Sequence, residues 1–480
     1  MLTVAALVAS LSFASPQSPQ DALRTLREEP ALEGARIGVF VRDLRDDSIV
    51  AESDSQRGFM TASNMKLVSL ATALSTLGPD FRFRTTLVAT GPIREGELFG
   101  DLVLIGSGDP SFGGRDEGED PAKVFDRMIE AAVQTHGLKR VRGNVLGDDD
   151  VQPDEVMGEG WAWNYEGDDY AAQVSGLCFA ENCIRLVLQP SAEGSMPRAR
   201  LSPATGFVEV ENRALCTAAG TKGILGVERL RASNHIRITG RMACDAKASR
   251  HLLSVENPTA YAATVLRERL VARGIVVDGG AFDRDVAPER PERYGDETVL
   301  AVHDSAPLSS ICTTLGKVSQ NLYAEQVIRA ASPGAHSMTA AAAHAKEVLA
   351  QIGVDTKGMR IADGSGLSRL DLVRPRQLGD LLSGVWRSPL RDSFRRCLPI
   401  GGVDGTLASR FVDPALRGRV VAKTGNISAV TALSGYVLRK DEAAPPLVFA
   451  VLLNDFTCPT AAAKEALDRF VAALVSAADR

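Results

Sequence analysis

The chain has 480 residues, which at about 150 residues per domain leaves room for about three domains and a large buried core. Hydrophobic residues make up 45% of it and charged residues 24%, so a disordered, collagen-like or coiled-coil protein is excluded. Lys and Arg number 54 against 60 Asp and Glu, a net charge of −6. Because this balance supplies no basic field for a polyphosphate, we expect no nucleic-acid partner.

The N-terminal segment is an uncharged apolar run, residues 2–14, that is too short to anchor a protein in a bilayer. Small residues at Ser12 and Ala14 are suited to cleavage. The run predicts a signal peptide over residues 1–14, no transmembrane anchor, and a periplasmic or otherwise extracytoplasmic protein. No Lys or Arg precedes the run, so a buried first helix remains the alternative.

A hairpin and a helix are predicted next. Residues 36–44 and 48–53 alternate like strands, and residues 45–47 between them have turn composition. The Leu- and Ala-rich run that follows predicts a helix beginning near Ser63 and capped by Thr61.

The middle of the chain is mixed and β-rich, with short strand-like runs in residues 85–104 and 201–238 and a helix at 121–136. Helical patterns return at 258–273 and dominate from residue 308 onward, including 339–352 and 375–386. Paired strands at 433–438 and 447–453 and a helix at 459–478 end the chain. This order indicates one α/β domain interrupted by a large β-rich insertion.

The seven cysteines form no CxxC pair and no cluster with the six scattered histidines, so we expect no metal and no cofactor. An oxidising compartment would allow disulfides between Cys178 and Cys183 and between Cys216 and Cys244. Buried free thiols are the alternative, of nearly equal weight.

Three short motifs carry the chemistry. Ser63 and Lys66 are three residues apart, which on a helix places a hydroxyl beside an ammonium. Ser319-Gln320-Asn321 follows in a loop between helices, and Lys423-Thr424-Gly425 follows on a predicted strand. Each motif is weak by itself, but the three in this order and context are specific.

With these motifs the chain resembles the serine penicillin-recognising enzymes, and within them the D-Ala-D-Ala carboxypeptidases of the penicillin-binding protein 4 type, peptidase family S13. Further similar stretches are residues 106–110, 363–369 and 398–407. The resemblance implies a transpeptidase or β-lactamase-like α/β domain, an antiparallel sheet flanked by helices, with a large β-rich insertion. We expect the catalytic domain at 20–88 plus 295–480, a second domain at 89–165 plus 252–294, and a third at 166–251.

The residues fit an acyl-enzyme mechanism. Ser63 is the expected nucleophile and Lys66 its base, which must be neutral at attack and so needs burial or a neighbouring cation such as Lys423. Ser319 would relay a proton to the leaving amine, and Asn321 would hold Lys66 and the substrate amide.

The strand motif is expected to bind the substrate. Lys423 and Thr424 would bind the terminal carboxylate, and Gly425 would allow close approach. By resemblance the second oxyanion N–H, besides that of Ser63, belongs to Asn426. Two departures from the family pattern, Gln320 in the second motif and Asn426 after the third, remove no catalytic group.

Other residues are expected to have supporting roles. Residues 363–369 should form a shaped turn behind the site. Glu325 should lie at the surface or cap a helix. The aromatic residues Trp161, Trp163, Tyr165 and Tyr170 should pack in the core of the insertion, and the alternative is that they line the path of the substrate.

The expected function is removal of the terminal D-alanine from peptidoglycan peptides, with possible cleavage of D-alanyl cross-links. β-Lactam antibiotics would acylate the same serine. A β-lactamase is the nearest alternative, and a non-catalytic penicillin-binding wall protein is a second.

Overall fold

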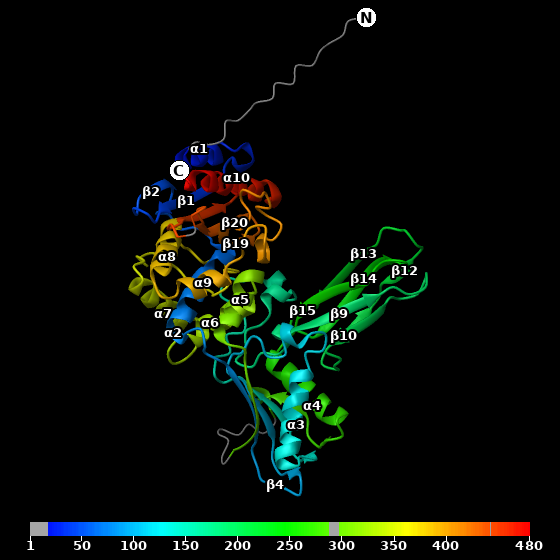
Figure 1. Ribbon diagram of the computed structural model, residues 1–480. Coiled ribbons are helices and arrows are strands. Elements are labelled where there is room, and N and C mark those ends of the chain that lie inside the picture. Colours follow the sequence, from blue (N-terminus) through cyan, green and yellow to red (C-terminus); the bar gives the residue numbers. More distant parts are fainter. Residues whose placement is uncertain (1–17, 288–296, 442) are drawn as a thin grey trace, which may run out of the picture.

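The computed structural model describes residues 18–287, 297–441 and 443–480 (Figure 1). The predicted signal peptide, residues 1–14, and the expected domain boundary at 294/295 lie outside these ranges. Within the described ranges, every helix is too short or too polar to span a bilayer.

A five-stranded antiparallel sheet forms the centre of the part that holds both ends of the described chain (Figure 1). Its order is β19-β20-β21-β1-β2, with β1 at Arg36–Asp43, β2 at Ile49–Ser53, β19 at Val420–Ile427, β20 at Val430–Val437 and β21 at Leu447–Asn454. Every residue of β20 and β21 is buried, because helices cover both faces of the sheet. The predicted hairpins at the two ends of the sequence therefore join into one sheet.

Helices cover the two faces of this sheet unequally. Helices α1 (Pro19–Arg27) and α10 (Thr460–Ala478) pack together on one face. Helix α1 lies against β1 and β2, and α10, with Leu467 and Phe470 buried, lies against β20 and β21. The other face carries α2 and α8 and, beyond them, the remaining helices of this part. Their bounds are α2 Lys66–Leu77, α5 Leu308–Val318, α6 Asn321–Ala330, α7 Met338–Gln351, α8 Pro375–Arg387 and α9 Arg391–Cys397.

The inserted sequence first forms two sheets with two helices, α3 (Lys123–His136) and α4 (Pro258–Ala272). One sheet has the order β17-β8-β6-β3-β18, in which β18 pairs with β3 and so returns the chain to the first part. The other has the order β16-β7-β5-β4. The strand bounds are β3 Arg84–Ala89, β4 Ile93–Arg94, β5 Glu97–Leu98, β6 Leu102–Ile105, β7 Arg140–Val141, β8 Val145–Asp148, β16 Val276–Val277, β17 Ala281–Asp283 and β18 Thr298–Asp304.

A second inserted region forms an arm of two sheets that extends away from the other parts (Figure 1). The sheet β10-β9-β15 packs its Leu186 side against Ile236 and Ile238 of the second sheet, in which β14 pairs with β11, β12 and β13. The strand bounds are β9 Cys183–Gln189, β10 Arg198–Ser202, β11 Glu209–Asn212, β12 Leu215–Thr217, β13 Ile224–Arg229, β14 His235–Ala243 and β15 Ser249–Ser254. The same apolar cluster continues to Tyr261 of α4, and the division into two inserted domains stays a prediction.

Two local expectations are decided by the structure. Thr61 does not cap the helix, because its hydroxyl makes no capping hydrogen bond; a 3-10 turn at Ala62–Met65 leads into α2, with Ala62 at a φ of 44°. The seven cysteines are free thiols, so the disulfide alternative is wrong.

Candidate active site

The first motif lies where the 3-10 turn meets α2. Ser63 is partly exposed, whereas Lys66, one turn later, is completely buried. The Lys66 ammonium donates to Ser63 Oγ at 2.9 Å, to Asn321 Oδ1 at 2.6 Å and to the backbone oxygen of Ser365 at 2.7 Å. A buried amine therefore contacts the one hydroxyl of this turn that reaches the surface.

The second motif lies between α5 and α6. Ser319 ends α5 in the left-handed conformation, with a φ of 64°, and Asn321 begins α6. Asn321 uses both ends of its amide, since Oδ1 accepts from Lys66 and Nδ2 donates to the backbone oxygen of Tyr170 at 2.6 Å. These two bonds fix which end of the amide faces the lysine.

The third motif completes the group from β19. Lys423 Nζ donates to Ser319 Oγ at 2.8 Å and to the backbone oxygen of Thr424 at 2.9 Å. Asn64, next to Ser63, donates to the backbone oxygen of Lys423 at 2.9 Å and so ties the nucleophile's turn to the strand. Segments separated by hundreds of residues thus meet at one place.

Burial controls the charge of the two lysines. It lowers the pKa of Lys66 to about 8, against the opposing effect of the Asp363, Glu325 and Asp371 carboxylates. Burial, and then the Lys66 ammonium, lower the pKa of Lys423 well below its usual range. Burial is thus the leading cause of the lowered pKa of Lys66, and a fraction of its amines is neutral near neutral pH.

The free edge of β19 offers backbone donors next to the motif. β19 is the outermost strand, and Ala422 N donates away from the sheet to Pro399 O at 3.0 Å. Alternate residues of a regular strand point to the same edge, so the N–H groups of Thr424 and Asn426 also point away from β20.

Gly425 is needed at this edge for steric reasons. A Cβ at this position would lie 2.8 Å from Thr61 O and 3.1 Å from Ser63 N. The absence of a side chain therefore lets the strand lie directly against the turn that carries Ser63.

A polar loop at residues 363–369 supports Lys66, as the sequence predicted for a shaped turn. Glu325 is buried here, so its expected surface or capping role is wrong: its Oε1 accepts from Gly364 N at 3.0 Å and Ser365 N at 2.8 Å, and its Oε2 from Arg329 at 2.6 Å. Asp363 accepts from Trp161 Nε1 at 2.8 Å. The loop amides can pair with Glu325 because its charge is balanced by Arg329.

The inserted region reaches the site through the second motif. Gln320 donates to Glu181 at 3.0 Å, and Glu181 also forms an ion pair with Arg115 at 2.6 Å. The prediction that the four aromatic residues pack in the core is wrong, since Trp163 is 68% exposed, Tyr170 is 42% exposed, and Trp161 and Tyr165 are only partly buried. The backbone oxygen of Tyr170 instead holds Asn321.

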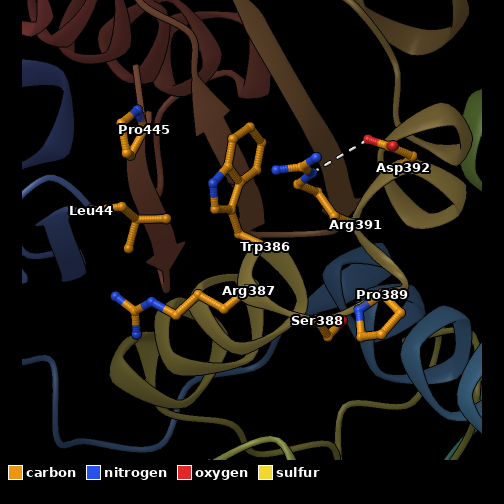
Figure 2. A pocket seen from close by; sticks show the side chains of 8 residues that line it. All are labelled: Leu44, Trp386, Arg387, Ser388, Pro389, Arg391, Asp392 and Pro445. Atoms are coloured by element: carbon orange, nitrogen blue, oxygen red, sulfur yellow. Dashed lines mark hydrogen bonds and ion pairs between the residues drawn. The ribbon is translucent and has the colours of Figure 1, made fainter. Parts of the chain in front are cut away.

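Two other features lie apart from these motifs. A surface pocket at the end of α8 is lined by residues none of which belongs to a predicted site, namely Leu44, Trp386, Arg387, Ser388, Pro389, Arg391, Asp392 and Pro445 (Figure 2). Among the described residues, the acidic group close enough to share a cation is Asp149, Asp150 and Asp285 of the insertion. Acidic groups of this kind are common without an ion, and we assign no metal there.

Comparisons with known proteins find relatives over most of the chain. The family model described as "D-Ala-D-Ala carboxypeptidase 3 (S13) family" matches residues 20–475. A D-alanyl-D-alanine carboxypeptidase of Actinomadura sp. (strain R39) is 34% identical over 474 residues, which covers 96% of this chain and 85% of the relative. A D-alanyl-D-alanine carboxypeptidase of Haemophilus influenzae is 25% identical over 84% of this chain and 83% of its own.

Solved structures match the fold over nearly the full length. The crystal structure of penicillin binding protein 4 from Haemophilus influenzae has a TM-score of 0.78 and 24% identity, and covers 94% of this chain and 97% of its own. The same protein complexed with a β-lactam has a TM-score of 0.73 and 23% identity over the same shares. From the family match and the Actinomadura relative, the chain belongs to the D-Ala-D-Ala carboxypeptidase 3 (S13) family.

Proposed function

We propose that this protein is a serine D-alanyl-D-alanine carboxypeptidase that acts on peptidoglycan stem peptides through an acyl-enzyme on Ser63. The carrying observation is the Lys66 ammonium, which lies 2.9 Å from Ser63 Oγ and 2.6 Å from Asn321 Oδ1 in a fully buried position. A buried amine with a pKa of about 8 beside a partly exposed hydroxyl is the pair that nucleophilic catalysis requires.

Acylation begins when neutral Lys66 takes the proton of Ser63 Oγ. The oxygen attacks the carbonyl carbon of the bond between the two D-alanines, and negative charge develops on the carbonyl oxygen. The backbone N–H groups of Ser63 and Asn426 are the proposed donors to that oxygen, at the N-terminal turn of a helix and on the free edge of β19.

The leaving amine of D-alanine then needs a proton. Ser319 Oγ is the proposed relay: it gives its proton to the amine and takes one from the Lys423 ammonium, which lies 2.8 Å away. The proton that Lys66 took from Ser63 then replaces the one lost by Lys423, so Lys66 is neutral again. Water next hydrolyses the ester on Ser63, with Lys66 as base for the water and Ser63 as the leaving alcohol.

The terminal carboxylate of the substrate is the proposed ligand of Lys423 and Thr424. The hydroxyl of Thr424 lies 2.8 Å from that of Thr406 and is partly exposed. A carboxylate at this place also keeps Lys423 charged, because it supplies the anion that its buried surroundings otherwise lack.

β-Lactams are proposed to acylate Ser63 in the same way, because their ring amide would occupy the position of the bond that is cut. The protein is proposed to act outside the cytoplasm, in the compartment where peptidoglycan lies. The catalytic domain is proposed to comprise residues 20–88 and 295–480, and the two inserted domains residues 89–165 with 252–294 and residues 166–251.

Release of free D-alanine from a diacyl-D-Ala-D-Ala peptide tests the function, with native protein beside Ser63→Ala. Ser69→Ala is the matched control, since it removes another hydroxyl from the same segment, one that donates to Gly364 O. We expect release by the native protein and the control and none by Ser63→Ala. Release by Ser63→Ala, or none by native protein that melts cooperatively, contradicts the proposal.

The rate of deacylation separates the proposed peptidase from the β-lactamase alternative. A carboxypeptidase turns over the peptide and keeps the penicilloyl group for many minutes. Rapid multiple turnover of a penicillin with no release of D-alanine would favour the β-lactamase.

A further inference from the structure

Four arginines share one face of the arm's three-stranded sheet. In β10-β9-β15, Ile184, Leu186 and Leu188 point into the arm's core, so the alternate residues of each strand form the opposite, outer face. That outer face carries Arg185 on β9, Arg198 and Arg200 on β10, and Arg250 on β15. We call this set the arginine face.

Strand register places these side chains close together. Arg200 and Arg250 both pair with Val187, one on each side of it, so they lie about 10 Å apart at the usual strand spacing. Arg185 is one step nearer the body of the protein, and Arg198 is one step farther out along the arm. Arg198, Arg200 and Arg250 are exposed, and Arg185 is partly exposed.

No carboxylate neutralises the arginine face within the described ranges, where the ion pairs and side-chain hydrogen bonds include none of its four guanidinium groups. Three other arginines of the same arm are paired: Arg213 and Arg237 with Glu211, and Arg231 with Glu166. In a chain with a net charge of −6, four unneutralised cations on one flat surface form a local site for a polyanion.

The arginine face is connected to the active site. β9 begins two residues after Glu181, which accepts from Gln320 of the second motif. Leu253 of β15 forms a bridge with Asp168, close in sequence to Tyr170, whose backbone oxygen holds Asn321. The outer face of this sheet thus runs outward from the segment that contacts the catalytic motifs (Figure 1).

We propose that the arginine face binds the carboxylates of polymeric peptidoglycan while one stem peptide occupies the active site. The proposal rests on the function proposed above. Every stem peptide that ends in D-alanine carries a free carboxylate, so the polymer presents many anions, and a guanidinium can pair with a carboxylate through two hydrogen bonds. Several weak contacts on one polymer add to the affinity of the active site.

The test compares native protein with the variant Arg185→Gln, Arg198→Gln, Arg200→Gln and Arg250→Gln. A control variant removes four exposed cations from other parts of the chain: Arg27→Gln, Lys123→Gln, Lys139→Gln and Lys357→Gln. Both variants have the same net charge, and unchanged thermal melting establishes that both fold. The readouts are co-sedimentation with purified, insoluble peptidoglycan and D-alanine release from that material and from a short soluble peptide.

The arginine-face variant is expected to lose about tenfold in affinity and kcat/KM on the insoluble polymer, since each exposed charge pair contributes a factor of about two. Its kcat/KM on the soluble peptide should stay native, and 0.5 M salt should remove most of the difference. Equal behaviour of the two variants on the polymer overturns the inference and leaves the proposed function standing. The inference is also overturned if only the arginine-face variant loses binding to a duplex DNA fragment while it binds peptidoglycan as the native protein does. Failure of native protein on both substrates counts against the proposed function itself.

Discussion

The pH dependence of acylation provides a sensitive test of Glu325. Its carboxylate and the Lys66 ammonium bind the N and O atoms of the same residue, Ser365, at 2.8 Å and 2.7 Å. Since those two backbone atoms are about 3 Å apart, the charges lie within about 9 Å. The negative charge favours protonated Lys66 and so opposes the effect of burial on its pKa.

Replacing Glu325 by Gln removes that charge and keeps an acceptor for the loop amides. At about 8 Å and an effective dielectric constant of about 20, the lost interaction is about 2 kcal/mol, or about 1.5 pH units in the pKa of Lys66. In native protein the rate of acylation by a penicillin should rise tenfold per pH unit and level off near pH 8, the pKa of the base. In Glu325→Gln the plateau should begin at a lower pH.

A double variant is the control. Glu325→Gln leaves the Arg329 guanidinium buried and unpaired, which costs about 3 to 5 kcal/mol of folding free energy. Glu325→Gln with Arg329→Gln also removes the unpaired guanidinium, so it should recover stability and, because Glu325 and not Arg329 acts on the pKa of Lys66, keep the inflection at the lower pH of the single variant. The assay is stopped-flow acylation from pH 5 to 10, with melting curves of each variant. An inflection that stays in place or moves upward in the single variant refutes the reasoning.

Three further substitutions test other contacts of the site. Gly425→Ala places a methyl group 2.8 Å from Thr61 O, so the turn of Ser63 must move. Acylation should slow by at least about tenfold, and the free energy of unfolding in urea should fall by about 1 to 3 kcal/mol. A native rate of acylation contradicts the close packing. Ser319→Ala should slow D-alanine release by about 100-fold or more, since it removes the proton relay and an acceptor of Lys423. A change under threefold in a variant that melts cooperatively would exclude that role. Trp161→Phe keeps an aromatic ring but removes the Nε1 donor to Asp363, so the free energy of unfolding in urea should fall by about 1 to 3 kcal/mol. Unchanged stability would mean that this hydrogen bond is not needed.

The chemical groups of the site were predictable because each motif has a side chain that the reaction requires. Ser63, Lys66 and Asn321 are joined by hydrogen bonds, Ser319 and Lys423 by another, and Asn64, next to Ser63, ties the two groups together through its bond to Lys423 O. The helices and strands near both ends of the chain were also predictable, since their apolar patterns are long and regular.

The supporting contacts were not predictable because they depend on partners distant in sequence. Glu325 and Arg329 are four residues apart, a spacing that is common on helices. This spacing does not indicate that the carboxylate of Glu325 is buried and accepts hydrogen bonds from loop amides 39 and 40 residues later. Tyr170 contacts Asn321 through its backbone oxygen, which every residue has. Its aromatic side chain predicted core packing and gave no sign of this contact. Thr61 has the residue type of a helix cap, but the positive φ of Ala62 turns the chain differently.

The most direct test of the central claim is to locate the covalent bond. Native protein is incubated with benzylpenicillin, its intact mass is measured, and a digest is mapped by tandem mass spectrometry, with Ser63→Ala and Ser69→Ala in parallel. The account predicts one penicilloyl group per chain, on the peptide that contains Ser63, in native protein and Ser69→Ala, and none in Ser63→Ala. An adduct on Ser319 or any other residue, or labelling of Ser63→Ala, would contradict it.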